Sequence, residues 1–321
     1  MRAVVLDGVN QPLRVVENHP EPTVGDGETI IEVTACGVCG SDLHVVDGDF
    51  PSPLPMVLGH EVTGVHEQLG PVMVYAPWGC RNCPQCADGL EQICPEATEA
   101  GLFTDGGYAE RMRIPDPSYL SPLGDLDPIN AAPLACGGLT AYRAVKQGVD
   151  TLRARGKNGR VMVIGAGGLG QYAIRYLRLL TEAQVAAVDL AADKQASALE
   201  IGAHEGLGPN DDLGHADVVL DFIGAEATLT TAAQVVKRQG LVAVVGLFGG
   251  RIPFGLGAVP HEARFMSSFW GSRPELDELL AFAHREPSIV QPVESLPLDQ
   301  AQIAHDRLRN GDLKGRLVLT V

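Results

Sequence analysis

Four cysteines share a fifteen-residue stretch with the spacing of a metal site. They are Cys80, Cys83, Cys86 and Cys94, in the pattern C-x2-C-x2-C-x7-C. Two-residue gaps let successive thiolates converge on one ion from a tight loop, and a fourth thiolate completes a tetrahedron. Chance clustering of free thiols is the alternative. Because all four positions are cysteine and none is left for water, the pattern predicts a closed, structural zinc site that does no chemistry.

A second set of metal-binding side chains is spread along the chain. Cys39, His60 and Cys136 offer two thiolates and one imidazole. Each alone is explained by packing, but together they form a three-ligand set with a fourth position open for chemistry. Cys36 makes a C-x-x-C pair with Cys39. Glycines around the pair indicate a loop rather than the helix start that a redox pair needs, so we interpret Cys36 as a bystander.

A glycine-rich segment has the pattern of a dinucleotide-binding loop. It reads Gly165-Ala166-Gly167-Gly168-Leu169-Gly170, the motif G-x-G-x-x-G, and lies between an expected strand, 161–164, and an expected helix. Such a loop gives a tight turn and lets a pyrophosphate approach the helix N-terminus. Asp189 ends the next expected strand, where its carboxylate would accept hydrogen bonds from an adenosine ribose. It would repel a 2′-phosphate, so the sequence favours NAD over NADP.

The elements that must position these residues differ between the two parts of the chain. The first 130 residues are rich in Pro and Gly, and runs such as 29–33 and 72–75 indicate short strands of a β-rich domain. Apolar strands then alternate with helices, which predicts an α/β domain with a doubly wound parallel sheet. The expected strands are 161–164, 185–188, 218–220 and 241–245. One expected helix follows the glycine-rich segment and ends near 180, and two more cover 191–201 and 226–237. The apolar run 241–248 reads as a buried strand interrupted by Gly246.

The C-terminal part adds a helix at 274–285 and a strand at 316–321. We expect this tail to return to the first domain. The predicted division is 1–132 with 270–321 for the first domain, which includes the cysteine lobe 80–94, and 133–269 for the nucleotide-binding domain.

Composition limits the classes of function. The chain has 321 residues, enough for two domains, and a formal net charge of −16 that disfavours non-specific nucleic-acid binding. No apolar stretch approaches the about 20 residues that cross a bilayer. Seven cysteines, six of them between Cys36 and Cys94, in a chain that looks neither small nor secreted indicate metal rather than disulfides. We expect a soluble, cytoplasmic protein.

These motifs together resemble the zinc-dependent alcohol dehydrogenases of the medium-chain dehydrogenase/reductase superfamily. The resemblance includes Gly59-His60-Glu61, the Cys-x-Ser-Asp-x-His string from Cys39, the cysteine lobe and the segment 134–142. It covers almost the whole chain and implies a β-rich GroES-like catalytic domain beside a Rossmann domain. The segment 269–276 looks most like bacterial secondary-alcohol dehydrogenases.

The resemblance implies a role for each residue around the open site. Cys39, His60 and Cys136 would bind the catalytic zinc, a set already known for alcohol dehydrogenases. Glu61 would lie behind the metal and approach it during ligand exchange. Asp42 would orient the liganding imidazole.

The same resemblance implies a proton relay and cofactor contacts. Ser41 would touch the substrate oxygen, and His44 would end the relay to solvent, while zinc acts as a Lewis acid and hydride passes to nicotinamide. Thr140 would contact the nicotinamide, Lys194 the adenosine ribose and Arg316 the pyrophosphate. For Lys194 and Arg316, a solvated surface charge is the alternative.

One segment departs from the family pattern. Residues 65–74, between His60 and Cys80, are shorter than usual and lack the customary Gly-Asp-x-Val turn. No metal ligand is lost, but the cleft beside the active site is expected to be trimmed. His66 is expected to be an exposed loop residue.

The sequence therefore predicts an enzyme with two zinc ions per chain that transfers hydride reversibly between an alcohol and NAD, and assembles as a homodimer or homotetramer. Phe50, Phe269 and Trp270 are candidate pocket walls and favour secondary alcohols with apolar or aryl groups. The alternatives are a polyol or amino-alcohol dehydrogenase, or a non-catalytic regulatory protein that binds zinc and a nucleotide.

Overall fold

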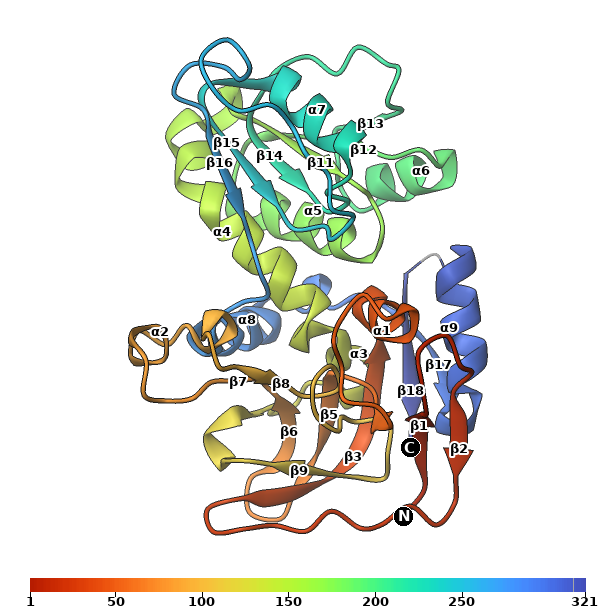
Figure 1. Cartoon of the computed structure of the whole chain (residues 1–321). Helices are drawn as coiled ribbons and strands as arrows, with labels where there is room; N and C mark the ends of the chain where they lie inside the picture. The colour runs from red at the N-terminus through yellow and green to blue at the C-terminus, as the bar shows by residue number, and fades with distance from the viewer. Residues whose placement is uncertain (314) are drawn as a thin grey trace. The chain divides into compact units, whose positions relative to one another are not determined.

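The chain folds into two compact units (Figure 1). The structure is a computed structural model that describes residues 1–313 and 315–321. Unit 1 comprises Met1–Leu139 and Gly271–Val321, and unit 2 comprises Thr140–Trp270. The sequence placed these junctions at 133 and 270. No helix formed by the described residues has the length and hydrophobicity that a membrane span requires.

Unit 1 is rich in antiparallel strands. Its largest sheet has the order β10 (Leu120–Pro122), β6 (Gly70–Val74), β5 (Glu61–His66), β3 (Thr29–Val38), β18 (Arg316–Thr320) and β17 (Val293–Pro297), with β9 (Arg111–Ile114) also paired to β3. A second sheet joins β2 (Arg14–Val16), β1 (Ala3–Leu6) and β4 (Met56–Val57), and a small pair joins β7 (Pro77–Trp78) to β8 (Thr98–Glu99). The helices are α1 (Gly40–Asp47), α2 (Pro84–Ala87), α3 (Pro128–Ala131), α8 (Arg273–Arg285) and α9 (Ala301–Asn310).

The long strand β3 organises the residues that matter for chemistry. It pairs with β5 on one side, with Gly37 opposite Glu61. It pairs antiparallel with β18 on the other side, with Val38 opposite Leu317. The expected return of the C-terminal tail is therefore present in the structure, and it carries Arg316 to the end of β3.

Unit 2 is a six-stranded parallel sheet. Its order is β13 (Glu205–Leu207), β12 (Gln184–Val188), β11 (Arg160–Ile164), β14 (Ala216–Asp221), β15 (Val236–Val244) and β16 (Arg264–Ser267). The helices are α5 (Gly168–Leu180), α6 (Ala192–Glu200) and α7 (Glu226–Val235), and α4 (Gly137–Arg155) leads into the unit. Side chains of β11 and β14 are almost fully buried, as a sheet covered on both faces requires. The predicted doubly wound α/β fold is confirmed.

Two sequence expectations in unit 2 were wrong. The helix expected to reach Lys237 ends at Val235, because Val236 already pairs with Ala216 as the first residue of β15. The apolar run expected as a strand to Phe248 leaves the sheet after Val244, and Phe248 is 71% exposed. In both places sheet pairing, rather than local hydrophobicity, sets the boundary.

The prediction of an exposed His66 was also wrong. His66 is the last residue of β5 and is 6% exposed. Its Nε2 lies 2.9 Å from the Thr29 hydroxyl, and its Nδ1 accepts hydrogen bonds from the backbone N–H groups of Gln68 and Leu69, both at 3.2 Å. The shortened segment is thus a tight hairpin between β5 and β6, and the His66 ring satisfies the polar groups of its turn.

Candidate active site

Three predicted ligands and one carboxylate meet inside unit 1. The donor atoms of Cys39, His60, Glu61 and Cys136 all lie within 4.8 Å of one another, and all four residues are buried. Cys39 caps the N-terminus of α1, His60 immediately precedes β5, and Cys136 immediately precedes α4. Segments far apart in sequence therefore place two thiols and an imidazole around one point.

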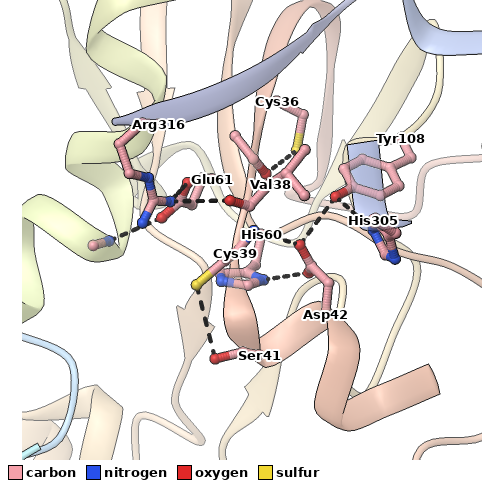
Figure 2. A network of polar contacts seen from close by, with 12 residues as sticks. Cys36, Val38, Cys39, Ser41, Asp42, His60, Glu61, Tyr108, His305 and Arg316 are labelled. Atoms are coloured by element: carbon pink, nitrogen blue, oxygen red, sulfur yellow. Dashed lines mark hydrogen bonds and ion pairs between the residues drawn. The ribbon is translucent and has the colours of Figure 1, made fainter. Parts of the chain in front are cut away.

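Asp42 lies behind the imidazole, as Figure 2 shows. Its Oδ1 is 3.0 Å from His60 Nδ1, and its Oδ2 accepts a 2.9 Å hydrogen bond from the Cys39 backbone N–H. Burial by itself would lower the pKa of His60, but Asp42 and then Cys39 raise it well above its usual value. The site therefore attracts positive charge. With Nδ1 directed at Asp42, Nε2 is the ring nitrogen for a metal, so these residues fit a zinc ion.

A buried ion pair holds the Glu61 carboxylate beside the three predicted ligands. Arg316 donates to Glu61 Oε2 and to the Val38 carbonyl oxygen at 3.3 Å, and the Gly137 N–H donates to Glu61 Oε1 at 2.9 Å. Burial raises the pKa of Glu61 to about 7, although Arg316 opposes the rise. A methyl group on Gly37 would lie 2.0 Å from Glu61 Oε2, so glycine is needed at this point of β3.

The two predicted relay residues lie on α1. The Ser41 hydroxyl is 3.9 Å from the Cys39 sulfur. His44 follows one helical turn later, with its Nδ1 2.7 Å from Asp49 Oδ2 and 23% of its side chain exposed. Phe50 packs near it, with 5.6 Å between the two ring centroids. One helix thus carries a hydroxyl beside the ligands and an imidazole that reaches solvent.

The cysteine lobe has the geometry of a closed zinc site. Cys83 Sγ lies 3.5 Å from Cys86 Sγ and 3.7 Å from Cys94 Sγ. Zinc–sulfur bonds of about 2.3 Å give tetrahedral sulfur–sulfur edges of about 3.8 Å. Backbone N–H groups at Cys80, Asn82, Cys86 and Glu96 point to these sulfurs at 3.4–3.5 Å. Such donors stabilise thiolates, so the lobe fits a zinc ion without any further ligand.

Two of the three motif glycines in the loop of unit 2, Gly165 and Gly170, are required for steric reasons. Gly165 has φ of +89°, which allows the tight turn. A methyl group on Gly170 would lie 2.0 Å from the Gly165 carbonyl oxygen, whereas one on Gly167 would meet nothing within 4 Å. The space beside Gly167 suits a phosphate at the start of α5. Asp189 borders the loop, because its Oδ2 accepts a 2.9 Å hydrogen bond from the Ala166 N–H.

Other predicted contact residues are placed as follows. Thr140 is 7% exposed on α4, and Lys194 is half-buried on α6. Trp270 is 4% exposed and packs edge-on against Phe269, which is 43% exposed. Arg316 is buried against Glu61 rather than solvated, and its contact with a pyrophosphate stays a prediction.

Two residues that no sequence motif predicted extend the polar contacts of Asp42. The Tyr108 hydroxyl donates to Asp42 Oδ2 at 3.0 Å, and His305 Nε2 lies 3.2 Å from the same hydroxyl. Neither residue belongs to a motif with a metal or catalytic spacing. Cys36, interpreted as a bystander, is fully buried, and burial raises its pKa well above the usual value.

The chain matches known families over both units. Residues 25–125 match the family described as alcohol dehydrogenase GroES-like domain, and residues 168–285 match the family described as zinc-binding dehydrogenase. An alcohol dehydrogenase from Geobacillus stearothermophilus is 33% identical over the full length of both chains. An NAD-dependent alcohol dehydrogenase from Sulfolobus acidocaldarius is 31% identical, again over both full chains.

Solved structures show the same likeness. The alcohol dehydrogenase from Aeropyrum pernix superposes with a TM-score of 0.90 at 30% identity, over all of both chains. The acetophenone reductase from Geotrichum candidum, solved with NAD, superposes with a TM-score of 0.87 at 28% identity, over all of this chain and 97% of that one. The chain therefore belongs to the zinc-dependent alcohol dehydrogenase family of the medium-chain dehydrogenase/reductase superfamily, as its motifs predicted.

Proposed function

We propose that this NAD-dependent zinc alcohol dehydrogenase oxidises secondary alcohols with apolar or aryl groups and reduces the matching ketones. The observation that carries the catalytic assignment is the buried convergence of Cys39, His60 and Cys136, with Asp42 behind the imidazole. Three protein ligands leave one position of a tetrahedral zinc for a substrate oxygen. We further propose a second zinc in the cysteine lobe, which gives two ions per chain.

The residues around the open site have distinct roles in this proposal. Bound there, zinc supplies the Lewis acidity that makes an alcohol hydroxyl acidic near neutral pH. The Ser41 hydroxyl relays the released proton: its oxygen accepts that proton as the hydroxyl gives up its own proton toward His44. His44, which reaches solvent on the same helix, passes it on. Asp42 holds the His60 ring in one tautomer and orientation. Glu61, paired with Arg316, lies behind the position of the metal and can approach it during ligand exchange.

Cofactor binding is assigned to the glycine loop and its neighbours. The pyrophosphate lies against Gly167 and the start of α5, and the Asp189 carboxylate accepts the ribose hydroxyls. Lys194 on α6 holds the same ribose, Thr140 contacts the nicotinamide, and Arg316 contacts the pyrophosphate.

Support for the substrate class is chemical. Phe50, Phe269 and Trp270 are aromatic candidates for pocket walls, and aromatic walls favour apolar or aryl groups on the substrate. Acetophenone, the substrate in the name of one structural neighbour, is an aryl ketone whose reduction gives a secondary alcohol. The assembly that we propose is a homodimer or homotetramer in the reducing cytoplasm, where seven cysteines persist without disulfide bonds.

A substrate panel tests the activity. Primary, secondary, polyol and amino alcohols are each offered with NAD, and NADH absorbance is recorded. We expect the highest kcat/KM with an aryl secondary alcohol such as 1-phenylethanol. A polyol or amino alcohol as the best substrate would refute the substrate proposal. No turnover of any alcohol by zinc-loaded protein would favour the regulatory alternative.

The cofactor assignment has its own test. Asp189→Ala removes the carboxylate that accepts the ribose hydroxyls of NAD and repels the 2′-phosphate of NADP. The ratio of kcat/KM for NAD over NADP should therefore fall about tenfold, mostly through a higher KM for NAD. The exposed carboxylate Asp193 on α6 provides the matched control, Asp193→Ala, which should leave the ratio unchanged. An unchanged ratio in Asp189→Ala would remove this residue from the assignment.

A further inference from the structure

A buried polar chain continues beyond Asp42 to the C-terminal helix α9 (Figure 2). It runs from His60 to Asp42 at 3.0 Å, from Asp42 to the Tyr108 hydroxyl at 3.0 Å, and from that hydroxyl to His305 Nε2 at 3.2 Å. Tyr108 is fully buried and His305 is 3% exposed. Burying two polar side chains is costly unless each is hydrogen-bonded, so their placement calls for a reason.

The backbone beside His60 is shaped around Tyr108. Gly59, directly before His60, has φ of +96°, and a methyl group there would lie 2.4 Å from the Tyr108 ring. The N–H groups of Gly107 and Tyr108 donate to the carbonyl oxygens of Gly59 and Leu58, at 2.8 and 2.9 Å. The phenol is therefore held against the segment that presents the His60 ligand.

The hydrogen bonds of Tyr108 and His305 both donate toward Asp42. Burial, and then Asp42, raise the pKa of Tyr108 well above its usual range, so its hydroxyl keeps its proton and donates it to Asp42. Burial lowers the pKa of His305, so its ring is neutral and has one N–H. Because the Tyr108 proton already points to Asp42, the contact with His305 is satisfied when the His305 Nε2–H donates to the phenol oxygen.

The Asp42 carboxylate consequently has several partners in fixed positions. The Cys39 N–H and the Tyr108 hydroxyl both donate to Oδ2, and His60 Nδ1 lies against Oδ1. A carboxylate held on one oxygen cannot rotate, and this fixes the direction in which the other oxygen meets the imidazole.

We propose that Tyr108 and His305 are positioning residues of the open zinc site. Their hydrogen bonds lock the Asp42 carboxylate, which in turn fixes the orientation of His60 and so strengthens zinc binding. This inference rests on the proposed function of Cys39, His60 and Cys136 as zinc ligands. It extends the site from α1 and the residue before β5 to a residue on α9, 245 positions after His60 in the sequence.

A second contact between α9 and α1, an ion pair at the surface, supplies the control. Arg309 on α9 makes a two-pronged ion pair with Asp47 on α1, at 2.9 and 2.7 Å, and both side chains are partly exposed. Arg309→Gln loosens the contact of α9 with α1 without touching the buried chain. It therefore separates a general loosening of α1 from loss of the Tyr108 and His305 hydrogen bonds.

The test measures zinc retention with a competing chromophoric chelator. Removing the residue that hydrogen-bonds a metal-binding histidine costs about 10- to 100-fold in metal affinity. Tyr108 and His305 lie one and two hydrogen bonds beyond that residue, which here is Asp42. We therefore expect zinc loss to be about tenfold faster in Tyr108→Phe and about threefold faster in His305→Leu. His305→Gln, whose amide N–H replaces the Nε2–H donor, should restore the wild-type rate, and Arg309→Gln should match it. The Cys80 lobe should release its zinc at the same rate in all variants. That rate is measured separately in Cys136→Ala, in which the lobe holds the only expected zinc ion.

A spectroscopic readout accompanies the kinetics. Cobalt(II) loaded at the open site should show shifted d–d absorption bands in Tyr108→Phe and His305→Leu, and wild-type bands in His305→Gln and Arg309→Gln. Wild-type zinc loss and cobalt bands in His305→Leu, failure of His305→Gln to restore them, or equal acceleration at both zinc sites would overturn the proposal. Absence of alcohol turnover in the zinc-loaded wild type would refute the proposed function while leaving these metal readouts interpretable.

Discussion

The two cysteine sites of unit 1 are built in opposite ways. The lobe takes four ligands from a single loop, Cys80–Cys94, and three of its four cysteines are partly exposed. The open site takes Cys39, His60 and Cys136 from three segments, and every ligand is buried. The lobe needs only its own loop to form, whereas the open site exists only when β3, β5 and the start of α4 are correctly packed.

The surroundings of the two sites differ as much as their ligands. Backbone N–H groups are the main donors to the sulfurs of the lobe. Charged side chains surround the open site, where Asp42 contacts His60 and Arg316 holds Glu61. The surroundings of the lobe therefore suit a site that stabilises a loop, whereas those of the open site suit a metal with one position free.

The largest effect should come from Cys136→Ala. Losing one of three ligands removes the metal from the open site, and with it several kcal/mol of transition-state stabilisation, so kcat/KM should fall at least about a thousandfold. Elemental analysis should show that the lobe keeps its zinc. Cys36→Ala removes a buried thiol that is no ligand and should keep both ions. Loss of both zinc ions from Cys136→Ala would contradict the independence of the two sites.

Ser41→Ala should have the next largest effect. The variant keeps all ligands but loses the hydroxyl that relays the proton, so kcat should fall about a hundredfold while the Kd for NAD, measured by titration, stays unchanged. Ser41→Thr retains a hydroxyl and should recover most of the rate. A near-normal rate in Ser41→Ala would remove the relay from the account.

Cys94→Ala tests the closed site and should affect stability instead of chemistry. The lobe should lose its zinc, and Tm should fall by roughly 5–10 °C because metal binding contributes to folding free energy. Activity of the folded enzyme at 25 °C should remain within about twofold of wild type. A hundredfold loss of kcat with the open-site zinc still bound would show that the lobe takes part in catalysis.

His66→Ala should have the smallest effect and should leave both proposed zinc sites unchanged. It removes the acceptor for two backbone N–H groups of the β5–β6 turn, at a cost of about 1–2 kcal/mol in the free energy of unfolding. Thermal unfolding should show a Tm a few degrees lower, with kcat and zinc content unchanged. Glu67→Ala, exposed in the same hairpin, serves as the control and should leave Tm unchanged.

The same contrast explains what the sequence could predict. The spacing of Cys80, Cys83, Cys86 and Cys94 predicted a cluster that the structure forms, because the ligands are local. The glycine loop and the parallel strands of unit 2 were predictable for the same reason: their patterns repeat over short windows. Their residue types allowed Cys39, His60 and Cys136 to be grouped as a possible ligand set, but their assignment to the catalytic zinc depended on family resemblance, since no spacing rule connects such distant residues.

Long-range contacts account for the errors and omissions. Tyr108 and His305 are 197 positions apart and meet only because β18 and α9 return to β3. The end of α7 at Val235 depends on the pairing of Val236 with β14. The burial of His66 depends on Thr29 in a neighbouring part of the sheet. None of these contacts leaves a local pattern in the sequence.

The most direct test of the account is a crystal structure of the zinc-loaded enzyme with NAD, using anomalous scattering at the zinc absorption edge. We expect two peaks per chain. One should be surrounded by four sulfurs, from Cys80, Cys83, Cys86 and Cys94. The other should be bound by Cys39, His60 and Cys136, with water or a substrate analogue in its fourth position. A single anomalous peak per chain would contradict the prediction of two zinc ions. Glu61 as the fourth ligand of the second zinc, in the presence of NAD and a substrate analogue, would contradict the prediction of an open position.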